Sequence, residues 1–145
     1  VHGDYKLDNV LFAPGPPEIA GVLDWEMSTL GDPLCDLGWL LFFWLEDGAD
    51  SSALMQTMGP TFLGAEGYRS RADLVARYEQ QTGITAENLT FHRVLAVYKM
   101  AALGEMFFAR YLMGHSNSSF YAMMAEGVPV LADQAISIIE GDRAL

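Results

Sequence analysis

The feature that most constrains this chain lies at its beginning, where an aspartate is followed five positions later by an asparagine. These residues are Asp4 and Asn9, and a further acid, Asp24, comes after two short apolar runs. The runs, 10–12 and 19–23, flank a turn rich in proline and glycine, which predicts a β-hairpin. Because a hairpin brings its two ends together, we expect Asn9 and Asp24 to lie close in space.

This spacing of oxygen-bearing side chains is typical of a site for phosphoryl transfer. Asp4 is the predicted general base, which orients an acceptor hydroxyl and takes its proton. Asn9 and Asp24 offer a carbonyl and a carboxylate oxygen, both of which suit Mg2+. Lys6 follows closely, and its ammonium group could offset the charge of the transferred phosphoryl group. Two interpretations of Asp8 remain open, a solvated loop residue, the commoner role, or a substrate contact.

Three runs of sequence, HGDYKLDNVLF, VLDWE and GDPLCDLGWLL, resemble the aminoglycoside phosphotransferase and choline kinase family. Within it they look like the phosphotransferases related to kinase domains of some acyl-CoA dehydrogenase fusions. The resemblance implies a protein-kinase-like fold, α+β and predominantly α, of which this chain is the C-terminal lobe with one β-hairpin beside the catalytic loop. It also implies ATP or GTP as co-substrate, Mg2+ as cofactor and a small molecule with a hydroxyl group as acceptor.

The resemblance implies the same catalytic and metal-binding roles that the residue pattern predicts, and it adds supporting residues. Glu26 either assists a second metal ion or only forms local hydrogen bonds, and both interpretations remain open. His2 and Asp36 are implied to support the catalytic loop by packing and hydrogen bonding. Asp32 precedes a proline, so we expect it to cap the next helix instead of binding a ligand.

The family covers the nucleotide phosphates with an N-terminal lobe that carries a glycine-rich loop, a strand lysine and a partner glutamate. Neither G-x-G-x-x-G nor G-x-x-x-x-G-K-[ST] occurs among the 145 residues. We therefore expect the nucleotide lobe to be absent from this chain, and the chain alone to be inactive. Without that lobe, the apolar surface that it would cover is exposed, and we expect a second copy of the chain to cover this surface in a homodimer.

Composition narrows the class of protein and its partners. Hydrophobic residues make up 51% of the chain and charged residues 19%, which predicts one globular domain. The net charge is −11, and eleven of the 19 acidic residues but only one basic residue lie within 1–68. The chain has no basic stripe, so nucleic acid is not an expected partner. Cys35 is the only cysteine, which excludes an internal disulfide, and we expect a cytoplasmic protein.

The rest of the chain is expected to be helical. The apolar run 37–45 predicts a buried core helix, because a membrane span needs about 20 residues, and no membrane association is expected. Residues 53–67 predict mostly loop with a short helical turn. An amphipathic helix is predicted over 70–81, with Ser70 and Asp73 as its cap and Gly83 as its end. Further predictions are a long helix over 90–113, a polar break at 116–119, a short helix or turn over 120–126 and a final helix over 129–140.

Apolar residues recur along the long helix at helical spacing: Phe91, Leu95, Tyr98, Ala102 and Met106. Because the apolar surface of this helix is broad, we expect it to be central to the fold. Near its end lie four candidate substrate contacts, Glu105, Arg110, Tyr111 and His115. Each has a commoner structural interpretation, such as a local helix contact for Glu105 and Arg110 or a loop position for His115.

Two other functional classes are compatible with parts of the pattern. A degenerate kinase fold used for binding or regulation would lack one of the three site residues, whereas Asp4, Asn9 and Asp24 are all present. A metal hydrolase would need a spaced set of ligands, but the sequence contains no H-E-x-x-H, and His92 and His115 have no ligand spacing. The sequence therefore favours a small-molecule kinase.

Overall fold

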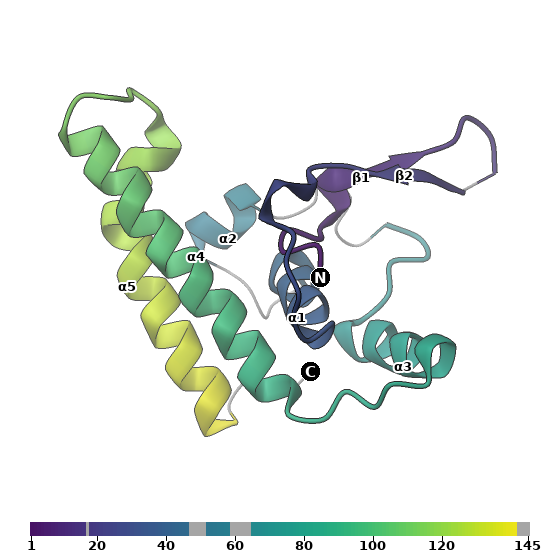
Figure 1. Cartoon of the computed structure of the whole chain (residues 1–145). Helices are drawn as coiled ribbons and strands as arrows, with labels where there is room; N and C mark the ends of the chain where they lie inside the picture. Colours follow the sequence, from purple (N-terminus) through teal and green to yellow (C-terminus); the bar gives the residue numbers. More distant parts are fainter. Residues whose placement is uncertain (17, 47–51, 59–64, 142–145) are drawn as a thin grey trace.

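The computed structural model describes residues 1–16, 18–46, 52–58 and 65–141. As expected, this part of the chain is α+β and predominantly α, with one two-stranded antiparallel sheet (Figure 1). Its elements are the short 3-10 helices η1 (Leu7–Asn9) and η2 (Trp25–Met27), the strands β1 (Val10–Phe12) and β2 (Ile19–Val22), and the helices α1 (Leu34–Phe43), α2 (Ala53–Met58), α3 (Arg71–Thr82), α4 (Leu89–Leu112) and α5 (Ser119–Glu140).

The predicted hairpin is confirmed. Val10 pairs with Val22 and Leu11 with Gly21, and the register becomes irregular at the next step. The hairpin projects away from the helices (Figure 1). Large apolar side chains on the hairpin and just after it are exposed: Leu11, Phe12, Ile19, Leu23, Trp25, Met27 and Leu30. That a second copy of the chain covers this surface remains a prediction.

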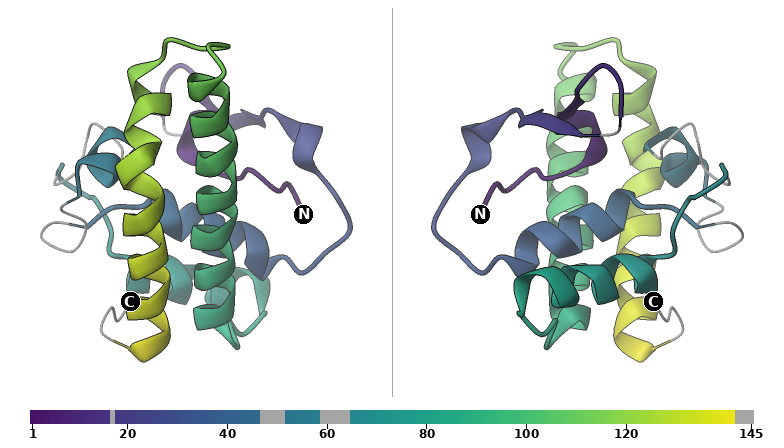
Figure 2. Two further views of the ribbon diagram at one scale, coloured as in Figure 1. Left: turned by 90° about the vertical axis from the view of Figure 1, so that its left-hand side faces the viewer. Right: turned by 90° about the vertical axis from the view of Figure 1, so that its right-hand side faces the viewer.

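Helices α4 and α5 lie side by side and antiparallel in both views of Figure 2 and form the largest helix contact. The predicted long helix and the break before α5 are confirmed, but the prediction that the last helix starts at Pro129 is wrong. α5 runs through Pro129 without interruption. A proline inside a helix costs about 3 kcal/mol, and burial of Met124 and Leu131 against the core offsets that loss.

α4 packs against both α1 and α5, but not all of its regularly spaced apolar residues enter the core. Phe91 and Tyr98 are 61% and 68% exposed. The buried face instead carries smaller or flexible residues, among them Ala96, Met100 and Gly104. A Cβ on Gly104 would lie 2.9 Å from Val128 of α5, so the absence of a side chain lets the two helices approach closely.

The predicted buried core helix is α1, which starts where the Asp32-Pro33 signal predicts and includes most of the apolar run 37–45. Asp32 caps it as predicted, since its Oδ1 accepts a hydrogen bond of 2.9 Å from the Leu34 amide. α3 has the predicted capping box between Ser70 and Asp73 and ends at Gly83 in the left-handed conformation. α1 lies between two apolar clusters, one with α2, α4 and α5 and one with α3.

Among the described residues, α5 is the one helix that is long and apolar enough to span a membrane by length and composition. A single helix of this kind is weak evidence for a span, because the core helices of many proteins pass the same test. In this structure α5 packs along α4, and Leu131 is completely buried.

A test of how closely α1 and α4 pack is the substitution Gly38→Ala. A Cβ there would lie 2.6 Å from the carbonyl oxygen of His92, a backbone atom that cannot rotate away. Alanine gains about 1 kcal/mol of helix propensity over glycine, but overpacking of a core typically costs about 1–3 kcal/mol. We expect a net loss of unfolding free energy in chemical denaturation. Gly21→Ala, where a Cβ meets no atom within 4 Å, is the control and should leave stability within about 0.5 kcal/mol.

Candidate active site

The predicted catalytic loop, residues 2–9, leads into β1, and the backbone amides of its first residues hold it to α1. The carboxylate of Asp36 on α1 accepts two hydrogen bonds, 2.7 Å from the His2 amide and 2.8 Å from the Gly3 amide. Gly3 has φ +83°, and a Cβ there would lie 2.4 Å from the Met27 carbonyl oxygen. Only glycine therefore fits at this position.

The His2 ring links the loop to the end of β2. Its Nδ1 accepts a hydrogen bond of 3.2 Å from the Asp4 amide, so the ring proton lies on Nε2 and is donated to the Leu23 carbonyl at 2.7 Å. The Leu23 amide in turn donates to the Asn9 carbonyl at 2.8 Å. These are the contacts that a supporting role for His2 and Asp36 requires.

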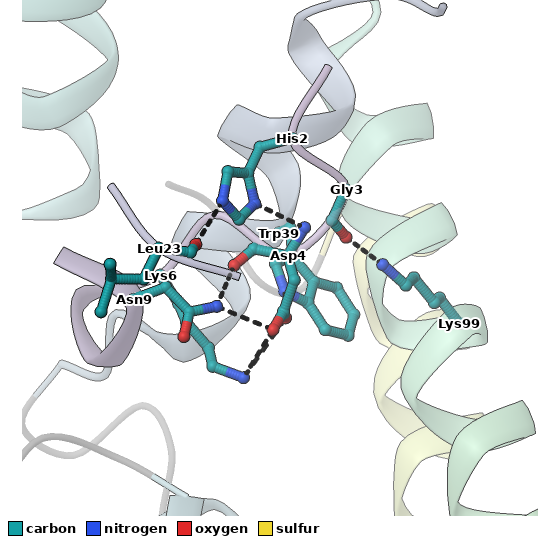
Figure 3. Close-up of polar contacts among 8 residues, drawn as sticks. All are labelled: His2, Gly3, Asp4, Lys6, Asn9, Leu23, Trp39 and Lys99. Carbon is teal, nitrogen blue, oxygen red and sulfur yellow. Dashed lines mark hydrogen bonds and ion pairs between the residues drawn. The ribbon is translucent and has the colours of Figure 1, made fainter. Parts of the chain in front are cut away.

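The Asp4 side chain is buried, and three side chains donate to its carboxylate (Figure 3). Oδ1 accepts from the Trp39 indole at 2.7 Å, Oδ2 accepts from the Asn9 amide at 2.9 Å, and the Lys6 ammonium contacts both oxygens at 3.2 and 3.1 Å. Burial alone would raise the pKa of Asp4, but these hydrogen bonds and the charge of Lys6 outweigh it and hold that pKa below its ordinary value of 3.8. Asp4 is therefore ionised at neutral pH.

Asp24 follows β2 and has a left-handed backbone, with φ 66° and ψ 56°, and an exposed side chain. Such a conformation is uncommon for a residue with a Cβ and often marks a functional position. Glu26 is exposed in η2, two residues further on. Because Leu23 bonds the Asn9 backbone, the chain enters Asp24 beside Asn9, as the hairpin predicts.

These positions fit a magnesium site of the kind that is completed by a nucleotide. Nδ2 of Asn9 donates to Asp4, which leaves the carbonyl oxygen turned away from that carboxylate (Figure 3). Within the described ranges, no three His, Cys, Asp or Glu side chains gather as a metal-binding group. Magnesium does not need such a group, since it commonly takes one or two carboxylates and fills its shell with water and substrate phosphates.

A cavity of about 480 Å3 opens next to Asp4. Its polar lining consists of Asp4, Lys6, Asp8 and Thr57. The remaining lining is apolar and comes from four helices and η2: Met27, Trp39, Phe43, Met58, Met100, Leu103, Phe107 and Phe120. Asp8 therefore lies where a substrate contact is possible, and methionines contribute to the wall as well as to the core.

The four candidates near the end of α4 lie elsewhere. Glu105, Arg110, Tyr111 and His115 are exposed, and none lines this cavity. A residue two positions along a helix from Leu103 is turned by about 200°, so Glu105 points away from the cavity wall. Their role in substrate binding remains a prediction, and the cavity does not support it.

Two residues at the centre of the site were not predicted from sequence, Trp39 and Lys99. Lys99 donates to the Gly3 carbonyl oxygen and lies 4.1 Å from the centroid of the Trp39 ring. Burial lowers the pKa of Lys99, and the charges of Asp4 and Asp36 oppose that effect only in part. The available signal was the presence of a lysine inside an otherwise apolar stretch of a core helix.

Cys35, His92 and Asp32 form a second cluster of polar side chains outside the catalytic loop. The Cys35 sulfur is 3.7 Å from Nδ1 of His92, whose Nε2 is 3.6 Å from the Asp32 carboxylate. Burial, with the charges of Asp32 and Asp36, raises the pKa of Cys35. The thiol therefore stays protonated at neutral pH, which agrees with a structural role and not with a nucleophile.

Comparisons with known proteins agree with this geometry. Acyl-CoA dehydrogenase family member 11 of Gallus gallus is 33% identical over 142 residues, which is 95% of this chain and 18% of that protein. Probable acyl-CoA dehydrogenase IBR3 of Arabidopsis thaliana is 28% identical over 121 residues, 81% of this chain and 15% of that protein. The chain thus spans less than a fifth of the length of these curated relatives.

A crystal structure from Ralstonia eutropha JMP134, of a protein assigned as an aminoglycoside phosphotransferase, superposes with a TM-score of 0.80. It is 27% identical, and the match covers 97% of this chain and 42% of that chain. The model of the phosphotransferase enzyme family matches residues 1–74, the half that holds the catalytic loop, the hairpin and α1. The chain therefore belongs to the phosphotransferase enzyme family.

Proposed function

We propose that the full-length protein transfers the γ-phosphoryl group of ATP or GTP to a hydroxyl group of a small molecule. The observation that carries this proposal is the buried, ionised Asp4 at the wall of a cavity, with Lys6 beside it. A carboxylate so placed can accept the hydrogen bond of an acceptor hydroxyl and take its proton as the bond to phosphorus forms.

Lys6 has two successive partners in this mechanism. Its ammonium lies 3.1 Å from Asp4 Oδ2, and its side chain is 23% exposed, twice the value of Asp4. When an acceptor occupies the cavity, the lysine leaves a carboxylate oxygen to the hydroxyl and turns toward the incoming phosphoryl group. There its charge stabilises the negative oxygens of the transition state.

Asn9 and Asp24 are the residues proposed to hold Mg2+, with Glu26 as a further acidic group nearby. A bound magnesium ion would supply positive charge that offsets the charge of the nucleotide phosphates. The chain's own contribution is to present an amide and a carboxylate oxygen from the two ends of one hairpin. The hydrogen bonds of Leu23 to His2 and Asn9 keep those ends together.

The residues that line the cavity indicate which chemical class of acceptor can bind there. Asp4 is already neutralised by Lys6, and Asp8 is the second acid in the wall, so few anionic groups face a polycationic ligand. Aromatic and methionine side chains dominate the rest of the surface. We therefore propose an acceptor whose hydroxyl is attached to a largely apolar body, since such a wall cannot hydrogen-bond a densely polar sugar.

A substrate screen on the full-length protein tests this function. ATP or GTP with Mg2+ is incubated with hydroxyl acceptors of four kinds, aminoglycosides, amino alcohols, sugars and hydroxyacyl compounds, and nucleoside diphosphate release is measured. We expect magnesium-dependent turnover with an acceptor that has an apolar body. Nucleotide binding without turnover on any acceptor would contradict the kinase and favour the binding or regulatory module.

The remaining proposals concern the chain's context. We propose that the 145 residues alone do not turn over ATP, because the chain has no glycine-rich phosphate loop. The natural protein is proposed to be cytoplasmic and to act on small molecules, without nucleic acid or membrane partners. Robust ATP turnover by this polypeptide would contradict the first statement.

A further inference from the structure

Trp39 makes an unusual contact for a core tryptophan. It lies on α1, only 4% exposed, and its ring packs against Phe42 and Phe43 as core aromatics do. Its indole N–H, however, points at Asp4 and donates to Oδ1 at 2.7 Å. A phenylalanine could keep the aromatic contacts but has no N–H, so the hydrogen bond to Asp4 is the property that tryptophan adds here.

The three donors to the Asp4 carboxylate differ in mobility. Lys6 is a flexible side chain that contacts both oxygens at the cavity wall. Trp39 and Asn9 are buried, and each bonds a different oxygen, Oδ1 and Oδ2 respectively. If Lys6 moves to the phosphoryl group, the two buried donors remain and still fix the plane of the carboxylate from both sides.

The indole ring is itself held in place. The Lys99 ammonium lies 4.1 Å from the ring centroid and donates to the Gly3 carbonyl oxygen, so α4 is connected to both the ring and the catalytic loop. A cation over an indole face is an attractive contact, stronger when it is partly removed from water. Figure 3 shows Asp4, Trp39 and Lys99 in this arrangement.

We propose that Trp39 is a positioning residue for phosphoryl transfer, whose indole N–H holds Oδ1 of Asp4 so that the carboxylate keeps its orientation toward the acceptor hydroxyl. This inference rests on the proposed kinase function. It predicts that the hydrogen bond acts on the catalytic step, and not on nucleotide binding, because Trp39 lies on α1 and contacts the general base.

The test is Trp39→Phe in the full-length protein. A hydrogen bond to a charged group contributes enough that kcat should fall roughly 10- to 100-fold, while the KM for nucleotide changes less than about threefold. A residue that only packs against the core would lower the stability of the protein without separating kcat from the KM for nucleotide in this way.

Trp44→Phe is the matched control. Trp44 also loses one indole hydrogen bond, of 2.7 Å to the Arg69 carbonyl, and also stacks on an aromatic ring, that of Tyr68. Its acceptor is a backbone carbonyl and not the Asp4 carboxylate, so kcat should not change. Two results would overturn the role of Trp39: equal effects of the two substitutions, or no effect of Trp39→Phe in an active enzyme. Either result would leave the proposed kinase function standing.

A second measurement does not depend on how Trp39→Phe folds. In protein labelled with 15N-tryptophan, one indole N–H resonance should move when Asp4→Asn is introduced, and it should differ from the resonance that Trp44→Phe removes. If no indole resonance responds to Asp4→Asn, the hydrogen bond does not exist in solution and the inference fails. If Asp4→Asn moves an indole resonance but the wild-type protein shows no magnesium-dependent turnover, the hydrogen bond exists and the proposed function fails. The catalytic role of Trp39 then fails with it.

Discussion

Asp4→Asn is expected to lower kcat of the full-length protein by about 10²- to 10⁴-fold, the range that a positioned general base contributes. The amide has the shape of the carboxylate but cannot take a proton from the acceptor hydroxyl. The amide oxygen can keep one of the two buried hydrogen bonds, from Trp39 or from Asn9, while the NH2 group faces the other donor, so chemical denaturation checks that the variant is folded. The measurement is steady-state turnover with the acceptor that the substrate screen identifies.

The matched control for this prediction is Asp133→Asn, which removes one negative charge from an exposed position on α5. Its kcat should equal that of the unmodified protein. Nucleotide affinity is measured in the same variant, because Asp4 accepts a hydrogen bond from Asn9, one of the two proposed metal ligands. A kcat for Asp4→Asn within a factor of three of wild type would remove Asp4 from the catalytic step.

Asp36→Ala is expected to have the largest effect on stability, a loss of about 2–5 kcal/mol in unfolding free energy. The substitution leaves the amides of His2 and Gly3 without the carboxylate that accepts both. Hydrogen bonds to a charged group contribute about 1.5–3 kcal/mol each, and partly buried donors that lose their acceptor add a desolvation penalty. Chemical denaturation measures the change.

Asp36→Asn separates the two effects of that substitution. Its amide oxygen can still accept from one backbone N–H, while its NH2 group faces the other, so the loss should lie between that of Asp36→Ala and zero. Asp133→Ala on the surface should be neutral within about 0.5 kcal/mol. If Asp36→Ala is equally neutral, the catalytic loop is held by other contacts, and the implied supporting role of Asp36 is wrong.

The parts of the fold that followed from sequence are those in which interacting residues are close along the chain. The hairpin follows from two apolar runs around a Pro/Gly turn, and the cap of α3 from Ser70 and Asp73 three residues apart. Asp32 before a proline likewise predicted the start of α1. Turn chemistry and capping depend on neighbouring residues, so a local pattern is sufficient to predict them.

The failures in the helical region have a different cause. The periodicity showed that Phe91 and Tyr98 share one apolar face, but α4 has apolar residues on several faces, and its partners decide which face is buried. The predicted start at Pro129 used the usual effect of proline on a helix. Packing of α5 along α4 outweighs that local effect, and no pattern within the segment shows how large the packing contribution is.

The sequence by itself determined the proposed site: an aspartate, an asparagine and a second acid at the spacing expected for phosphoryl transfer, on a hairpin that joins two of them. Only the tertiary structure decided how the aspartate is held, because Trp39 reaches Asp4 across 35 positions and Lys99 reaches Gly3 across 96. Contacts at such separations depend on how α1 and α4 pack against the loop. Local propensity and spacing carry no information about that packing, which the whole set of helices establishes together.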